Sequence, residues 1–429
     1  METNGGRQTI INISDILWEL NKLIKPMNTE QETKDIPSKT DGMTKKYRLD
    51  TADTTTIDGR TLSRIVALKN FSNVREGDKG GYIESEGNLS QYDDAWVYDN
   101  AYVFMDAKVF GNACVRDNAL VFGNAKVYGE SKISGNAKVH GDSLVSDTAS
   151  VSCKARIFGE ARVYDDASIS GEAHVFDHAW ICNNVKVYDK ARVYGNARVL
   201  GNAKVFGHAA VLGDALVSGY AEVYGSACVL DSTRVFDRAQ VFGEARVRNN
   251  AYVYRHARVY ERAEVYHNAK INGDAQVYGA ARVFGNSNVH GYSKVYGDAC
   301  VLDRAQVCDT ANVFGEAIIY GNACVLDDAW ISGNANVGGN AWIPDSARIS
   351  GRDECFCAQT FGSAGRTTTF FKKENGWAVN CGCFTGTIEE FREKVKETHG
   401  YSLIAQEYLM IADLMELRAK RVELEAKND

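Results

Sequence analysis

Two pairs of cysteines near the C-terminal end have the residue type and the spacing of a metal site. Cys355 and Cys357 form one pair, Cys381 and Cys383 form the other, and one residue separates the members of each pair. Four thiolates brought together by a hairpin could hold a tetrahedral Zn²⁺. Zinc knuckles usually have two intervening residues, and alternate residues of a strand can equally face one core as small hydrophobic side chains. Both interpretations stay open, and no other cofactor is indicated.

A six-residue repeat fills most of the chain before these cysteines. From Val97 to Ile349 every sixth residue is Val or Ile, 43 times in succession without an insertion. Two residues before each of them is a small side chain, which is Ala in 37 of the 43 cases. Residues two apart on a strand share a face, so the small and the aliphatic side chains both point inward. Each repeat is therefore predicted to be one short strand.

Corner residues separate these predicted strands. Two residues after each aliphatic position the chain has Gly 24 times, Asp 12 times and Asn twice, which are the residue types that tolerate positive φ. Strands this short bury their inner faces only by coiling and stacking, three strands to a turn. The repeats then give about 14 coils, a rigid rod roughly 70 Å long at about 4.8 Å per coil. The predicted fold class is an all-β parallel β-helix.

This pattern resembles the hexapeptide-repeat (LpxA-like) superfamily. There an aliphatic residue is followed four positions later by a small one, as Val205 is by Ala209. The family usually carries Gly or an acidic residue directly after the aliphatic residue, whereas this chain has Phe206 and then Gly207. The resemblance implies a left-handed, single-stranded β-helix, a homo-oligomer such as a trimer, and CoA-dependent acyl transfer as the activity commonest on this fold.

A second resemblance lies upstream of the repeats. The segments TKKYRLD and RIVALKNFSNVREGDKGGYIESEGNLSQYDDAWVYDNA look like the opening of the bacterial YdcK-like proteins, which carry a transferase label without a described chemistry. The spacing of Phe71, Val74, Gly77, Gly80 and Gly81 carries the match. The resemblance implies a β-helical architecture and no particular reaction.

Four regions are predicted along the chain. Residues 1–45 form an amphipathic helix that begins near Ser14, followed by a flexible polar linker. Residues 46–92 form an N-terminal β cap, 93–351 form the parallel β-helix, and 352–429 form a module with a hairpin and two helices. In this module the hairpin is predicted to turn at Glu374-Asn375-Gly376, and Thr387 and Glu390 form a capping box at the start of the first helix. The segment TTTFF…NCGCFTGTIEEFREKVKETHG resembles C-terminal modules encoded in Gram-positive bacteria and their prophages.

Aromatic residues recur directly after the inward aliphatic residue. A step of eighteen places eight of them in one file, which we call the aromatic file: Tyr188, Phe206, Tyr224, Phe242, Tyr260, Tyr278, Tyr296 and Phe314. Stacked rings could simply stabilise the corner, since rings about 4.8 Å apart gain packing energy. An exposed apolar stripe could equally be a surface for a protein partner or for self-association.

Four successive corners lack glycine and aspartate, and charged residues surround them. The members of this irregular charged patch are Arg255, His256, Arg258, Glu261, Arg262, Glu264 and His267. Departures from a local rule often mark functional sites, so the patch is a candidate for binding, although a solvated surface explains the same residues.

An acyltransferase would need a histidine base in a cleft. The array histidines are His140, His174, His178, His208, His256, His267 and His290, and all occupy outward or corner positions typical of solvated side chains. No inserted loop interrupts the repeats to shape a cleft. The pattern therefore favours a structural protein over an enzyme.

Composition excludes several classes of partner. The net charge of -7 and the absence of a basic stripe argue against nucleic acid and anionic membranes. No apolar run is long enough for a signal peptide core or a membrane span, and the eleven scattered cysteines do not form a secreted disulfide framework. We expect a cytoplasmic, non-catalytic interaction protein with a protein partner or itself as ligand. The alternative is an acyltransferase-like enzyme working at a subunit interface.

Overall fold

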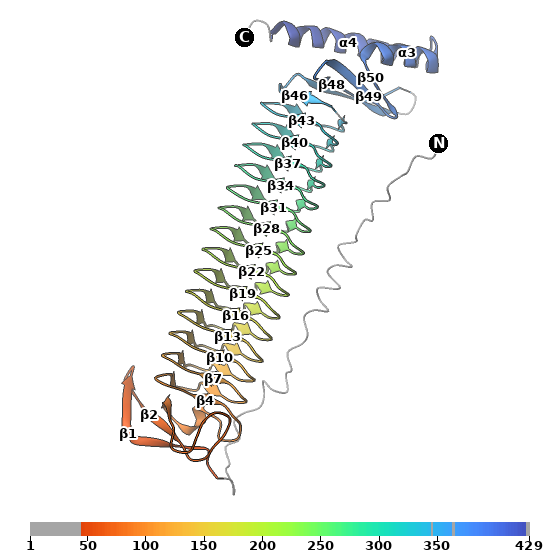
Figure 1. Cartoon of the computed structure of the whole chain (residues 1–429). Helices are drawn as coiled ribbons and strands as arrows, with labels where there is room; N and C mark the ends of the chain where they lie inside the picture. The colour runs from red at the N-terminus through yellow and green to blue at the C-terminus, as the bar shows by residue number, and fades with distance from the viewer. Residues whose placement is uncertain (1–43, 345, 363–364, 426–429) are drawn as a thin grey trace. The chain divides into compact units, whose positions relative to one another are not determined.

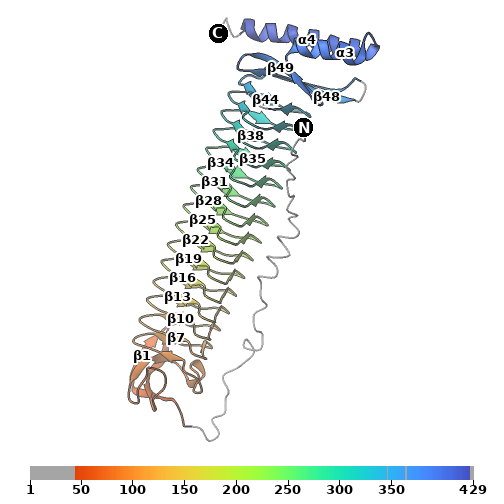
Figure 2. The same ribbon diagram turned by 45° about the vertical axis from the view of Figure 1, so that its right-hand side comes forward.

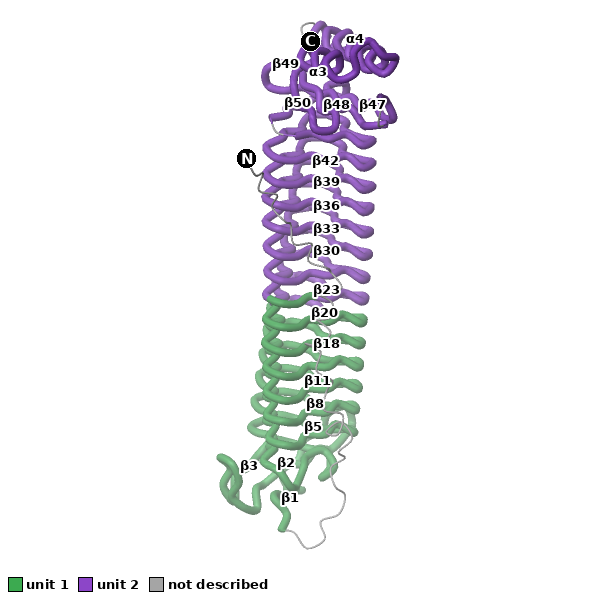
Figure 3. Tube along the Cα trace, turned by 90° about the vertical axis from the view of Figure 1, so that its right-hand side faces the viewer, with its two compact units in different colours: residues 1–189, 194–203, 217–219 green, residues 190–193, 204–216, 220–429 purple. Residues whose placement is uncertain are grey.

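The computed structural model describes residues 44–344, 346–362 and 365–425, and the helix and linker predicted within 1–45 lie almost entirely outside them. The chain forms two compact units (Figure 3). Unit 1 holds residues 1–189, 194–203 and 217–219, and unit 2 holds 190–193, 204–216 and 220–429.

The repeats form a parallel β-solenoid of about 15 turns, which confirms the predicted fold class (Figure 1). Its two-residue strands begin with β4 (Trp96–Val97), recur every six residues and end with β46 (Arg348–Ile349). Each strand pairs in parallel with the strand eighteen residues later, as Lys132 pairs with Ser150 in unit 1 and Gln240 with Arg258 in unit 2. Three strands therefore complete each turn.

The inward positions form a continuous core in each unit. The Ala and Val side chains of the repeats are completely buried, and so are the exceptions Ser131, Ser143, Thr233, Ser287 and Ser293. Ser131 and Ser287 satisfy their hydroxyl groups by donating to the carbonyl three residues earlier. At these two positions serine can replace alanine because its hydroxyl group finds an acceptor in the same repeat, whereas the buried hydroxyl groups of Ser143 and Thr233 have no partner.

The corners adopt positive φ, as their residue types predict. Gly243 has a φ of +69°, and a Cβ there would lie 2.7 Å from the backbone nitrogen of Glu261 in the next turn. Aspartate serves at other corners for a different reason. Asp117 and Asp177 each accept a hydrogen bond from the corner N–H of the next turn, at 2.7 and 3.1 Å. Aspartate thereby offsets the strain of positive φ with a bond that glycine cannot make.

The N-terminal end of unit 1 is an antiparallel hairpin that leads into the solenoid. Strand β1 (Tyr47–Ile57) pairs with β2 (Arg60–Ala67), and β2 pairs with β3 (Lys79–Ile83). Strand β3 then pairs in parallel with β5 (Tyr102–Val103), a strand of the first turn. A 3-10 helix η1 (Glu86–Asn88) follows β3.

The C-terminal end of unit 2 is a four-stranded antiparallel sheet with two helices. Its strands are β47 (Cys355–Phe361), β48 (Arg366–Lys373), β49 (Gly376–Cys381) and β50 (Phe384–Gly386), and its helices are α3 (Ile388–His399) and α4 (Leu403–Glu425). The predicted hairpin at Asn375–Gly376 and the predicted capping box of Thr387 and Glu390 are confirmed. Both helices lie on the outer side of this sheet, away from the last solenoid turn (Figure 2).

Candidate functional site

The aromatic file is a continuous stack of rings within unit 2. From Phe206 to Phe314 each ring lies 4.8 or 4.9 Å from the next, with interplanar angles of 6° or less. This spacing equals the separation of neighbouring strands, because each ring belongs to the same edge of a successive turn. Tyr188, the first predicted member, belongs to unit 1.

These rings are half-buried, and their hydroxyl groups stay protonated. Burial raises the pKa of Tyr278 to about 12, and it also raises the pKa of Tyr224, Tyr260 and Tyr296. The ring faces are covered by their neighbours, while the ring edges contact solvent. Tyr260 donates from its hydroxyl to the Gln276 Oε1 at 3.2 Å. The file therefore presents neutral hydroxyl groups and apolar edges.

Unit 1 carries a second stack that the sequence reading missed. Its members lie on another edge of the turns, one strand further round: Phe104, Phe122, His140, Phe158, Phe176 and Tyr194. Ring centroids are 4.6 to 5.2 Å apart. The same step of eighteen, started from Phe104, would have found it. Burial, with Arg156 and Lys138 nearby, lowers the pKa of His140, so its imidazole is neutral at pH 7 like the rings on either side of it.

The irregular charged patch does not gather on one surface. Its corner residues Arg255, Glu261 and His267 are six residues apart, so they occupy the three different corners of a turn. His256 and Arg258 do come together, in a polar groove of about 430 Å³ that Asp274, Tyr292 and Lys294 also line. In this groove the Nδ1 of His256 lies 3.7 Å from Asp274 Oδ1.

Three of these corners are strained. Arg255, Glu261 and His267 have φ of 60°, 57° and 57°, a region that side chains with a Cβ adopt at a cost. Glu261 offsets this by accepting a hydrogen bond from the N–H of Gly279 at 2.9 Å. Arginine offers no acceptor for such a bond.

The four C-terminal cysteines do not converge. Cys355 and Cys357 on β47 pair with Phe371 and Thr369, whereas Cys381 on β49 pairs with Thr368, which is adjacent to Thr369 and so points to the other face of β48. Directly opposed residues share a face, so Cys381 faces α3 and α4 while the β47 thiols face the solenoid. Burial raises the pKa of Cys355 to about 12 and also raises that of Cys357. Within the described ranges, no group of three or more His, Cys, Asp or Glu side chains is arranged to hold a metal ion.

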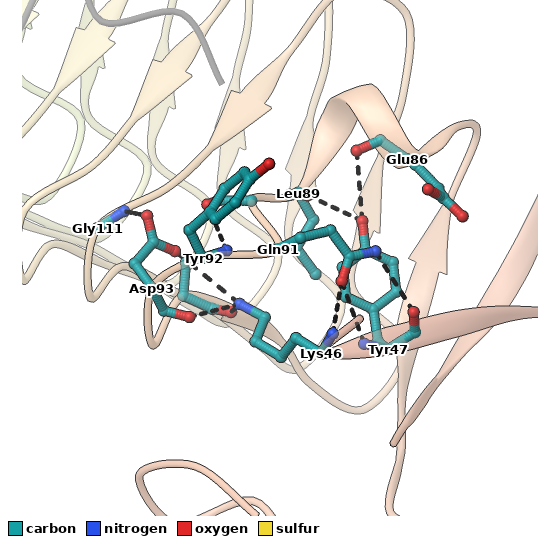
Figure 4. A network of polar contacts seen from close by, with 10 residues as sticks. Lys46, Tyr47, Glu86, Leu89, Gln91, Tyr92, Asp93 and Gly111 are labelled. Atoms are coloured by element: carbon teal, nitrogen blue, oxygen red, sulfur yellow. Dashed lines mark hydrogen bonds and ion pairs between the residues drawn. The ribbon is translucent and has the colours of Figure 1, made fainter. Parts of the chain in front are cut away.

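The N-terminal end of the solenoid contains a buried lysine that the sequence reading gave no role (Figure 4). Lys46 is 1% exposed, and its Nζ donates to the carbonyl oxygens of Asp93 and Ala95, each at 2.7 Å. The same Nζ lies 3.9 Å from Asp93 Oδ1 and 5.0 Å from the centre of the Phe71 ring. Burial lowers the pKa of Lys46 to about 8, against the attraction of Asp93 and Asp94.

Lys46 belongs to a set of donors that cover one edge of the first turn. In the ladder the N–H groups point to the following turn, as Trp96 N donates to Ala113 O, so the first turn leaves its carbonyls without a preceding turn. Asn88 Nδ2 donates to Met105 O and Ala107 O at 2.8 and 2.9 Å. Arg64 Nη1 donates to Asp99 O at 3.1 Å. Three backbone N–H groups also donate to carbonyl oxygens of this turn: that of Tyr82 to Ala101, that of Glu84 to Val103 and that of Ser90 to Val109.

The last turn leaves backbone N–H groups without a following turn, and side-chain acceptors bond to them. Glu354 is 6% exposed, and its Oε2 accepts from the N–H groups of Ser350 and Gly351 at 2.6 and 3.0 Å, while Lys372 pairs with its other oxygen. The Thr369 Oγ1 accepts from Trp342 N at 3.1 Å. Burial alone would raise the pKa of Glu354, but the bonds from Lys372, Ser350 and Gly351 outweigh it and lower the pKa.

Neither helix of the C-terminal module, nor any other helix in the part of the chain that the structure describes, is long and apolar enough to cross a membrane.

Comparison with known proteins gives one family match. Residues 191–207 match the YdcK β-solenoid repeat. A search of the curated proteins finds no match to the chain. The hexad pattern, the solenoid of about 15 turns and this match together fit a hexapeptide-repeat protein that is similar to the YdcK β-solenoid family.

Proposed function

We propose that this chain is a non-catalytic scaffold whose solenoid mediates protein–protein contacts through the aromatic file of unit 2. The observation that carries the proposal is the stack from Phe206 to Phe314, in which seven successive turns present the edge of an aromatic ring at one place. Tyrosine and phenylalanine are enriched at the centres of protein interfaces because they bury much area and lose little side-chain entropy.

The surroundings of the file support the same use. The outward strand residues next to it include Lys204, Glu222, Gln240 and Arg258, and Lys204 pairs with Glu222 at 2.9 Å. An apolar stripe with a polar margin of mixed charge is the usual anatomy of a contact surface between proteins. Tyrosine hydroxyl groups are neutral donors near neutral pH, and burial raises the pKa of these tyrosines further.

The competing explanation is that the rings only stabilise the turns, and one variant separates the two. We would replace Tyr224, Tyr260 and Tyr278 by Ser and use the full chain as bait in host lysate, with quantitative mass spectrometry of the captured proteins. The matched control replaces Phe122, Phe158 and Phe176 of the unit 1 stack by Ser. We expect proteins captured at near-stoichiometric amounts by the native chain to be lost with the first variant and retained with the second. Equal capture by both variants, with a lowered melting temperature, would assign the file to stability alone.

An acyltransferase is the alternative that the fold suggests by analogy. A thermal-shift titration with acetyl-CoA tests it directly, since a ligand that binds only the folded state raises the melting temperature. We expect no shift at sub-millimolar acetyl-CoA. A clear stabilisation that depends on an array histidine such as His256 would reverse the ranking in favour of the enzyme.

A further inference from the structure

Helix α4 has a second apolar stripe on the face turned away from its own core. The stripe follows heptad spacing, with steps of seven, four, three and seven residues, and its members are 55 to 77% exposed: Leu403, Met410, Leu414, Leu417 and Leu424. A surface helix normally needs one apolar face, so a second one indicates a further contact.

The core of the C-terminal module does not use this stripe. Tyr408, Ile411 and Met415 of α4 are buried against Phe370 and Val379 of the sheet and against residues of α3. At 100° per residue these positions lie on a different side of the helix from Met410, Leu414 and Leu417. The inner face of α4 therefore packs in the core of the module, while the outer stripe is exposed and contributes nothing to that core.

Two charged residues within the stripe indicate which kind of helix can pack on it and in which direction. Glu407 and Arg421 continue the heptad positions of Leu414, seven residues to either side. A parallel pair of α4 helices would place Glu407 against Glu407 and Arg421 against Arg421. An antiparallel pair with its twofold axis beside Leu414 places each Glu407 within one turn of the partner subunit's Arg421. The same axis brings Met410 near the partner subunit's Leu417, and Leu403 near the partner subunit's Leu424.

We propose that α4 binds the α4 of a second copy of this chain in this antiparallel arrangement. Such an isologous contact uses one patch twice, so the symmetry of the sequence about Leu414 is what a twofold contact requires. The apolar side chains extend over about 30 Å of helix at 1.5 Å per residue. This contact uses a surface separate from the aromatic file, so either proposal can fail without the other.

A hollow beside the stripe gives the partner's side chains a place to pack. It has a volume of about 420 Å³ and is lined by Phe356, Leu414, Met415, Leu417, Arg418 and Arg421. In this arrangement the apolar side chains of one helix insert beside Leu414 and Leu417 of the other. The Arg418 guanidinium already lies over the Phe356 ring, at 5.2 Å from its centre, and forms one wall.

The existing contacts of the two charged residues leave them able to pair across the axis. Arg421 lies 3.2 Å from Asp353 and 3.7 Å from Glu425, but Asp353 is shared with Arg418 at 2.5 Å. Asp353 and Glu425 are thus the carboxylates nearest Arg421, but its side chain is still 53% exposed and can turn toward a carboxylate across the axis. Glu407 lies on the opposite side of Leu414. Among the described residues, its carboxylate accepts one long hydrogen bond, at 3.4 Å from the N–H of Gly362.

The test measures the mass of the full chain by analytical ultracentrifugation at micromolar concentration. We expect a dimer for the native chain and a monomer for Leu414→Lys, with unchanged circular dichroism and melting temperature because Leu414 is exposed. Tyr292→Lys, at a residue 66% exposed on the solenoid, is the matched control and should stay dimeric. A monomeric or trimeric native chain, or a dimer that survives Leu414→Lys, would overturn the proposal.

A charge exchange tests the antiparallel direction. Glu407→Arg and Arg421→Glu should each raise the dimer dissociation constant about tenfold or more, because like charges then face each other across the axis. The double variant reverses every pair and should return the dissociation constant to within about threefold of the native value. A double variant that is as weak as the worse single variant would refute the antiparallel pairing.

Discussion

The first and the last turn of the solenoid leave opposite kinds of backbone group without a partner in the ladder. At the beginning, in unit 1, the first turn presents carbonyl oxygens that have no earlier N–H groups to bond, and the covering groups are donors such as Lys46, Arg64 and Asn88. At the finish, in unit 2, the last turn presents N–H groups, and the covering groups are acceptors such as Glu354 and Thr369. A parallel ladder has a direction, so its two edges differ in polarity.

Each cap is therefore chemically specific for the end of the solenoid that it covers. A buried backbone group without a partner costs free energy whichever sign it has, but a carboxylate cannot satisfy a carbonyl and an ammonium cannot satisfy an N–H. Pro344 avoids an unpaired N–H group at the last turn in a second way. It lies eighteen residues after Leu326, whose N–H donates to Ile343 O in the ladder. Because proline has no N–H, the equivalent position in the last turn has no donor that lacks a partner.

The largest effect is expected at the C-terminal end. Glu354→Ala should lower the free energy of unfolding by about 3 kcal/mol, because it leaves Lys372 without its partner and two N–H groups without an acceptor. The native contribution is full above the ordinary glutamate pKa of 4.5 and is lost as the pH falls through the lowered pKa of folded Glu354. Urea unfolding between pH 3 and 7 measures it.

The exposed Glu374 in the hairpin of the same sheet supplies the control for Glu354. Glu374→Ala should change stability by less than about 0.5 kcal/mol. Equal effects of the two substitutions would mean that the last turn does not depend on its acceptors.

A smaller effect is expected at the N-terminal end. Lys46→Met should lower stability by about 2 kcal/mol at pH 7, since two carbonyls lose a donor while the aliphatic stem is preserved. The folded pKa of Lys46 is about 8, below the ordinary 10.5, so the unfolded chain holds more protons between these values. Native stability should therefore rise with pH from about 8 to 10.5, and this rise should disappear in the variant.

Hydrogen exchange at the amides of β4 to β6 (Lys108–Val109) locates the effect of Lys46→Met at the first turns. Lys45→Met tests the neighbouring lysine, which forms an exposed ion pair with Glu86 at 2.7 Å and should matter by less than about 1 kcal/mol. If Lys45→Met and Lys46→Met lower the free energy of unfolding by the same amount, the buried Lys46 donor does not stabilise the first turn.

The smallest effect concerns the two ring stacks. The unit 1 stack contains His140 between Phe122 and Phe158, whereas the unit 2 stack from Phe206 to Phe314 contains only Phe and Tyr. The pKa of His140 is lowered, so native stability falls as the pH drops below 6.5 toward the folded pKa. His140→Phe should raise the melting temperature at pH 5.5 by a few degrees, about 1 kcal/mol, and change it less at pH 8.

The exposed His208 in unit 2 provides the comparison for His140. His208→Phe should change stability by less than about 0.5 kcal/mol at pH 5.5, since this side chain is exposed and lies outside the stack. A native melting temperature that is flat between pH 5 and 8 would contradict the role given to His140.

The repeat pattern was sufficient to predict the solenoid, because one period of six fixes the inward Ala and Val, the corner and the eighteen-residue turn without help from distant contacts. The same local rules predicted the hairpin at Gly376, the capping box at Thr387 and the stack from Phe206 to Phe314. Each of these features depends on residues within one repeat or at a fixed step, so a linear pattern contains all the information that it needs.

The three-dimensional fold was needed to show which residues act together at the ends and on the corners. It buried Lys46 but exposed Lys45, although the two are adjacent and chemically equal, because burial depends on how β1 enters the first turn. It divided Arg255, Glu261 and His267 among three corners and placed Cys381 on the opposite face of its sheet from Cys355. Such positions follow from the pairing of segments far apart in the chain, which no local period encodes.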